Sequence, residues 1–116
     1  MYLDMMQNYQ QTFSRFVKET RKMIVLNVLY KCRPDMREEF LERIYTEGID
    51  KASRAEEGNI TYDYYTSLDR SEELLLLEKW RDADALAVHS QQPHFVRLGG
   101  FINDYVADTV VEKYEV

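Results

Sequence analysis

His89 and His94 are the two histidines of this chain, and histidine is the side chain that most readily changes its protonation near neutral pH. A neutral imidazole at the rim of an apolar pocket can accept a proton from a bound substrate, so either residue is a candidate general base. The alternative is structural, because the two residues flank Pro93 and could position a break between two helices.

The two histidines do not match a known metal-binding motif. Their spacing of five positions across a proline is not the i, i+4 pair of a helical zinc site, and Cys32 is the single cysteine. A metal site would need carboxylates from elsewhere in the chain. Glycine patterns that bind nucleotides or flavins are also missing from the sequence, which therefore predicts neither a metal nor a cofactor.

Six further side chains are candidates for binding a substrate. Trp80 and Glu78 share one face of a predicted strand, where an indole can stack on a planar molecule and donate its N–H. A buried Glu78 would have a raised pKa and could relay protons. Both residues also have an ordinary structural interpretation, as a core aromatic and as a carboxylate bonded to a backbone group or an arginine. The other candidates are Tyr62 and Asn27 as orienting donors, Phe95 as part of the pocket wall, and Arg97 as a group that holds an anion.

Seven elements must position these side chains. Apolar alternation predicts strands over residues 23–33, 60–67, 73–81 and 107–116. Helical periodicity predicts helices from Asp35 to about residue 55, from Asp82 to Ser90 and from Pro93 to Tyr105, with the two aspartates as N-caps. The order βαββααβ is the ferredoxin-like α+β arrangement, with a four-stranded antiparallel sheet.

Large apolar side chains occupy both faces of the third predicted strand. Leu75 and Leu77 lie on one face, and Leu74, Leu76 and Trp80 on the other. Since helices can cover one face only, an identical chain is expected to cover the open face, which predicts a homodimer. Residues 23–116 form the predicted domain. Residues 1–22 are predicted to form an amphipathic helical extension that docks on the domain or on a second subunit.

The composition excludes two classes of partner. Twenty-one acidic residues against fifteen basic ones give a net charge of −6, whereas binding to nucleic acid requires a concentrated positive face. No apolar run approaches the roughly 18–20 residues of a membrane span. We expect a cytoplasmic, single-domain protein.

With the elements placed, the sequence resembles the antibiotic biosynthesis monooxygenase family of dimeric α+β barrels. The resemblance rests on residues 23–40, 53–62, 77–82 and 89–95, the last of which form an H-x-x-x-P-H-F pattern. It implies that Trp80 and Glu78 face a pocket between sheet and helices. It also implies cofactor-independent monooxygenation, by molecular oxygen, of a small quinol-like or polyphenolic substrate. The chain departs from phenol-oxidising members at Leu76, where they carry asparagine, and from the haem-degrading branch at Val28.

Two other functions fit the same fold. One is a non-oxidative isomerase of a small phosphorylated or dicarbonyl metabolite, which an Arg97 facing inward beside the histidines would favour. The other is a small-molecule-binding protein without turnover. A pocket filled by Phe95, Trp80 and Leu76, with both histidines outside, would favour that function.

Overall fold

The computed structural model describes residues 22–116. The helix predicted over residues 1–22 therefore falls, but for Lys22, outside the described residues. The elements, in chain order, are β1 (Ile24–Cys32), α2 (Arg37–Thr46), α3 (Ile49–Arg54), β2 (Asn59–Thr66), β3 (Glu73–Trp80), α4 (Ala83–His89), α5 (Pro93–Tyr105) and β4 (Val106–Glu115).

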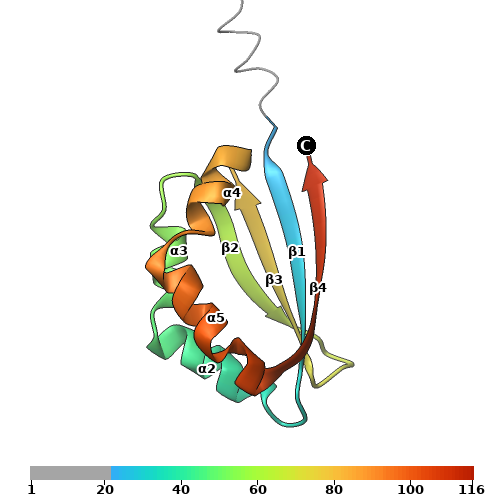
Figure 1. The fold of residues 1–116 in the computed structure, drawn as a ribbon. Helices are drawn as coiled ribbons and strands as arrows, with labels where there is room; N and C mark the ends of the chain where they lie inside the picture. Colours follow the sequence, from blue (N-terminus) through green and yellow to red (C-terminus); the bar gives the residue numbers. More distant parts are fainter. Residues whose placement is uncertain (1–21) are drawn as a thin grey trace, which may run out of the picture.

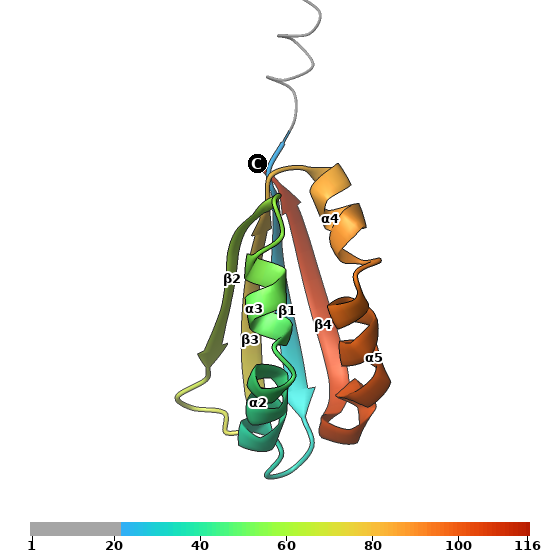
Figure 2. The same cartoon turned by 90° about the vertical axis from the view of Figure 1, so that its left-hand side faces the viewer.

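The four strands form one sheet in the order β2-β3-β1-β4, and every neighbouring pair is antiparallel. The four helices of residues 22–116 lie on the same face of this sheet (Figure 1). Seen from the helical side, they make two columns, α2 with α3 and α4 with α5 (Figure 2). The predicted ferredoxin-like α+β fold is confirmed.

The core lies between the sheet and the helices, and strict alternation along the central strands creates it. In β1, burial alternates from Ile24 to Tyr30, and in β3 the buried positions are the even-numbered ones from Leu74 to Trp80. Because side chains of a strand point alternately to its two faces, these rows meet the helices together. Phe40 and Ile44 of α2 complete the packing and are fully buried.

The long helix predicted after Asp35 is two helices. Gly48 separates α2 from α3 with a φ of +69°, a left-handed conformation that a residue without a Cβ adopts at no steric cost. The predicted cap at Asp35 is also wrong. Asp35 itself has a positive φ of 62°, and α2 begins two residues later, with Met36 as an N-cap whose side chain makes no capping bond.

The cap predicted at Asp82 and the helix start predicted at Pro93 are confirmed. The Asp82 side chain accepts a hydrogen bond from the Ala85 backbone N–H at 2.9 Å, and Pro93 occupies the first turn of α5. Both features suit helix starts, since the first N–H groups lack partners within the helix. They mark where α4 and α5 begin.

No helix among the described residues covers the second face of the sheet. A row of apolar side chains crosses this open face through the paired positions Tyr65, Leu75, Leu29 and Val110. Tyr65 and Val110 are 51% and 41% exposed. The homodimer expected through this face stays a prediction. None of the helices in residues 22–116 is both long and apolar enough to cross a bilayer.

Candidate active site

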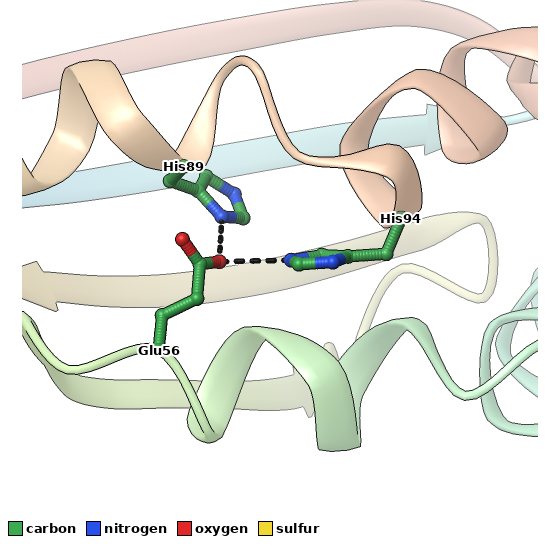
Figure 3. A group of neighbouring side chains, drawn as sticks. All are labelled: Glu56, His89 and His94. Atoms are coloured by element: carbon green, nitrogen blue, oxygen red, sulfur yellow. Dashed lines mark hydrogen bonds and ion pairs between the residues drawn. The ribbon is translucent and has the colours of Figure 1, made fainter.

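One carboxylate joins the two histidines in the layer of helices. The Oε2 atom of Glu56 lies 2.5 Å from Nδ1 of His89 and 2.8 Å from Nε2 of His94 (Figure 3). His89 is 3% exposed and His94 7%, and the Glu56 side chain is 11% exposed. We call these three residues the trio. It is a buried, hydrogen-bonded group whose members are 33 and 38 positions apart.

Each member of the trio stands at an element's end. Glu56 follows the C-cap of α3, His89 is the last residue of α4, and His94 is the second residue of α5. Gly58 lets the Glu56 loop approach α4, because a Cβ added there would lie 2.2 Å from the Cβ of Ala85. His89 follows Ala85 by one helical turn, so this close approach brings the imidazole to the carboxylate.

The hydrogen bonds fix which nitrogen of His89 is free. An ionised carboxylate only accepts, so Glu56 requires a proton on Nδ1 of His89 and on Nε2 of His94. Nε2 of His89 is then left as the basic nitrogen, and it lies 3.8 Å from Oε1 of Glu78. Burial lowers the pKa of His89, while the hydrogen bond and the charge of Glu56 oppose that shift. The net direction favours a neutral imidazole, the form that can accept a proton.

Glu78 and Trp80 form the floor beneath His89. The Trp80 indole N–H donates to Oε1 of Glu78 at 2.9 Å, and both side chains are buried. Burial raises the pKa of Glu78 to about 7, against the effect of the Trp80 hydrogen bond and with a further contribution from the charge of Glu56. Glu78 can therefore exchange a proton near neutral pH. The indole and the His89 ring are stacked, with centroids 4.5 Å apart and planes at 33°.

Two aromatic side chains enclose the His89 ring from other directions. Tyr62 approaches it edge-on at 5.8 Å, and Phe95 does so at 5.3 Å. Tyr62 is 2% exposed, and its burial raises its pKa to about 12, so its hydroxyl stays protonated as a donor. The structure thus brings together six predicted residues: His89, His94, Trp80, Glu78, Tyr62 and Phe95.

Two predicted residues lie elsewhere. Asn27 alternates with the buried Leu26 and Val28 of β1 and so points to the open face of the sheet, paired with Glu112 of β4. The Arg97 guanidinium bonds the backbone oxygen of Glu47 at 3.1 Å and its carboxylate at 3.4 Å. Neither side chain contributes to the trio or to its floor.

Sequence reasoning missed Glu56 as a site residue. One signal was present, since Glu56 and Glu57 follow the end of a helix, where the partial negative charge of the helix dipole disfavours carboxylates. Glu57 behaves as a surface residue, with a side chain 94% exposed. The Glu56 side chain, in contrast, points inward and contacts the two histidines.

A hollow of about 250 Å³ reaches one member of the trio, Glu56, from the surface. Glu56 forms part of its wall, and the Arg81 side chain at its side is engaged with Glu57 at 3.7 Å and with Asp82 at 3.3 Å. The full lining is Glu56, Glu57, Gly58, Arg81, Ala85, Val88 and Gln92. Small molecules and ions can therefore approach Glu56 without unfolding of α4.

In residues 22–116, the trio is the one cluster of three or more histidine, cysteine or acidic side chains that could ligate a metal ion. One ligand atom from each residue lies within 4.8 Å of the others. The carboxylate that the histidine spacing lacked thus comes from the loop after α3.

Comparison with known proteins gives the family. The family model of the antibiotic biosynthesis monooxygenases matches residues 23–98, about two thirds of the chain. The chain belongs to this family. A relative from Bacillus subtilis (strain 168), named "Putative monooxygenase YcnE", is 40% identical over 73 residues, covering 63% of this chain and 75% of that protein.

Solved structures share the fold. A Bacteroides thetaiotaomicron protein described as a "Possible Oxidoreductase" superposes with a TM-score of 0.75 at 31% identity, covering 84% of this chain and all of that one. A Nitrosomonas europaea protein titled "Putative antibiotic biosynthesis monooxygenase" gives 0.75 at 22% identity, over 84% and 92% of the two chains. The names in the family support a monooxygenase-like function for this chain.

Proposed function

We propose that this protein catalyses cofactor-independent monooxygenation of a small quinol-like or polyphenolic substrate, with His89 as the general base. The observation that carries the proposal is the orientation of His89. Its Nδ1 is tied to Glu56, while its Nε2 is directed to the side of Glu78 and Trp80. A buried, neutral imidazole held in one tautomer is what proton abstraction from a phenol requires.

The reaction balances without an added reductant. Nε2 of His89 takes the phenolic proton, and the resulting anion transfers an electron to molecular oxygen far more readily than the neutral phenol does. One oxygen atom ends in the ring of the product and the other in water. The quinol supplies all four electrons and leaves as a hydroxylated quinone.

The neighbouring side chains have roles that follow from their contacts. Glu56 is a positioning residue, because it holds the tautomer and the ring orientation of His89. Trp80 provides a flat apolar surface beside the imidazole, and Tyr62 is a protonated donor for an oxygen of the substrate. Glu78 lies 3.8 Å from Nε2 of His89 and, with a pKa of about 7, can accept from His89 the proton that it has taken from the substrate. His94 stabilises the carboxylate that orients the base.

We also propose that the protein is a homodimer joined through the open face of its sheet. Support comes from the row of Tyr65, Leu75, Leu29 and Val110, which is apolar and which no described helix covers. Such a face is costly to leave in water. The cytoplasmic location expected from the sequence stays a prediction.

Two alternatives receive less support from the geometry. An isomerase of a phosphorylated metabolite would need a cation beside the histidines, and Arg97 is instead bonded to Glu47. A binding protein without turnover was expected to leave the histidines outside the pocket, and here both are buried.

Oxygen consumption tests the proposal. The purified full-length protein, treated with EDTA, is given a panel of quinols, and uptake is compared with the autoxidation blank. We expect uptake that falls at least about 100-fold in His89→Gln, since a general base contributes roughly that factor or more. The Glu42→Gln control removes an exposed charge of α2, outside the hollow, and should retain full activity. Absence of uptake across the panel, or full uptake by His89→Gln, would refute the proposal.

A further inference from the structure

We infer that the trio is also a binding site for one divalent transition-metal ion of the Zn²⁺ type. The ligands are Nδ1 of His89, Nε2 of His94 and the carboxylate of Glu56. Two imidazoles and one carboxylate are ligands that zinc takes readily, with a water completing a four-coordinate site. The inference goes beyond the proposed function, because binding of the ion does not require that any substrate be oxidised.

The distances between the ligand atoms of the trio allow a metal ion to replace the protons that bridge Glu56 and the two histidines. Zinc lies about 2.0–2.1 Å from its ligands, so neighbouring ligand atoms in a tetrahedral site are roughly 3.3 Å apart. The Glu56 oxygen now lies 2.5 and 2.8 Å from the two nitrogens, because protons bridge these pairs. Replacing the protons by an ion requires each oxygen–nitrogen separation to widen by less than about 1 Å, and the two nitrogens, which lie within 4.8 Å of each other, to approach by up to about 1.5 Å. Rotation of the side chains can supply both changes.

The state of the second oxygen of Glu56 supports the metal site independently. Oε1 is buried and has no hydrogen-bond partner among the described residues, a costly state for a carboxylate oxygen. A cation bound to the carboxylate would satisfy it electrostatically. The hollow with Glu56 in its wall provides a route for the ion as far as that residue.

The surroundings of His89 resemble those of ligating histidines in general. Such residues almost always direct their second ring nitrogen at a carboxylate or a carbonyl, which fixes the tautomer and increases the basicity of the ligand. Nε2 of His89 lies 3.8 Å from the Glu78 carboxylate, which Trp80 in turn holds by a hydrogen bond of 2.9 Å. Glu78 is therefore the expected outer partner of the site.

Composition makes the site easy to isolate experimentally. His89 and His94 are the only histidines of the full chain, and Cys32 is its only cysteine and is buried. Removing one histidine thus leaves a single imidazole in the whole protein. A change in zinc affinity can be attributed to the trio.

Isothermal titration of the EDTA-treated full-length protein with ZnCl₂ tests the inference, and the visible spectrum of a Co²⁺ titration reports coordination by nitrogen and oxygen. We expect one ion per chain, with protons released on binding. Affinity should fall by about 100-fold or more in Glu56→Gln and His94→Gln, and by about 10-fold in Glu78→Gln, whose residue only orients a ligand. Glu42→Gln, at an exposed carboxylate of α2 outside the hollow, should bind as the unchanged protein does.

No stoichiometric binding, or equal affinity in Glu56→Gln with a native circular dichroism spectrum, would overturn the inference. The outcome is separate from that of the proposed oxidation, since the titration contains no quinol. If both proposals hold, Zn²⁺ should inhibit oxygen uptake and EDTA should restore it, because an ion on Nδ1 places the remaining proton of His89 on Nε2.

Discussion

Replacing Gly58 by alanine should displace the loop that carries Glu56. The added Cβ would lie 2.2 Å from the Cβ of Ala85 and 3.4 Å from its Cα. Carbon atoms in contact are about 3.5–4.0 Å apart, so the loop and α4 would have to separate by more than about 1 Å. Both are held in place. Gly58 accepts a backbone hydrogen bond from Arg81 at 2.8 Å, and the Ala85 N–H is bonded to the Asp82 cap.

The expected loss of stability follows from this overlap. Overpacking a fixed site costs about 1–3 kcal/mol, and the 2.2 Å approach puts Gly58→Ala near the upper end. Alanine recovers about 0.4–1 kcal/mol by restricting the unfolded chain, so the net loss should be about 2 kcal/mol. Gly100→Ala is the matched control, because a Cβ there meets nothing within 4 Å. In the middle of α5 it should stabilise the protein by about 0.5–1 kcal/mol.

Urea denaturation followed by the fluorescence of Trp80, the one tryptophan, measures these free energies of unfolding at a fixed protein concentration. The double variant Gly58→Ala, Ala85→Gly removes the opposing Cβ and tests the mechanism. It should recover most of the loss, apart from about 1 kcal/mol for a glycine inside α4. A Gly58→Ala variant as stable as the parent, or a double variant whose losses simply add, would refute the reasoning.

Three further outcomes are expected. Gly48→Ala should lower the free energy of unfolding by about 1 kcal/mol through its left-handed backbone alone, since no atom lies within 4 Å of the added Cβ; an unchanged urea midpoint would contradict this. Asp82→Ala should lower the free energy of unfolding by about 1 kcal/mol, because it removes the cap of α4. Urea denaturation measures this loss, and an unchanged free energy would mean that the cap is dispensable. In metal-free protein, Glu78 has a folded pKa of about 7 against 4.5 in the unfolded chain, so the folded state binds the proton more tightly. Stability should therefore fall by up to about 3 kcal/mol as pH rises from 4.5 through 7, a slope that Glu78→Gln should flatten. A Glu78→Gln curve parallel to that of the parent would assign the slope to other groups.

Strand periodicity predicted most of the fold because it is a local signal. Alternation along β1 and β3 placed Trp80 and Glu78 on the helical face, and it also indicated the apolar open face. The same period of two explains why Asn27 does not reach the trio. A single position along a strand decides the face, and Asn27 lies between two buried neighbours.

Glu56 could not be predicted as a site residue, since its role depends on contacts between distant segments. Nothing in the local sequence distinguishes it from Glu57, yet one carboxylate contacts two histidines and the other is in solvent. The difference arises from the packing of the α3–β2 loop against α4, which the close approach of Gly58 to Ala85 permits. The position of Arg97 was unpredictable for a related reason, because its side chain is bonded to Glu47, fifty positions away.

The pairing of β1 with β4 has a consequence for the order in which the protein can fold during synthesis. β1 lies inside the sheet between β3 and β4, and the backbones of Met23 and Val116 exchange hydrogen bonds of 3.0 and 2.9 Å. A ribosome releases residues 24–32 long before residues 106–115. Until the later segment emerges, one edge of β1 has no strand to pair with and is open to pairing with another chain. The nascent protein should therefore depend on a chaperone, or on rapid completion, for as long as β4 is missing.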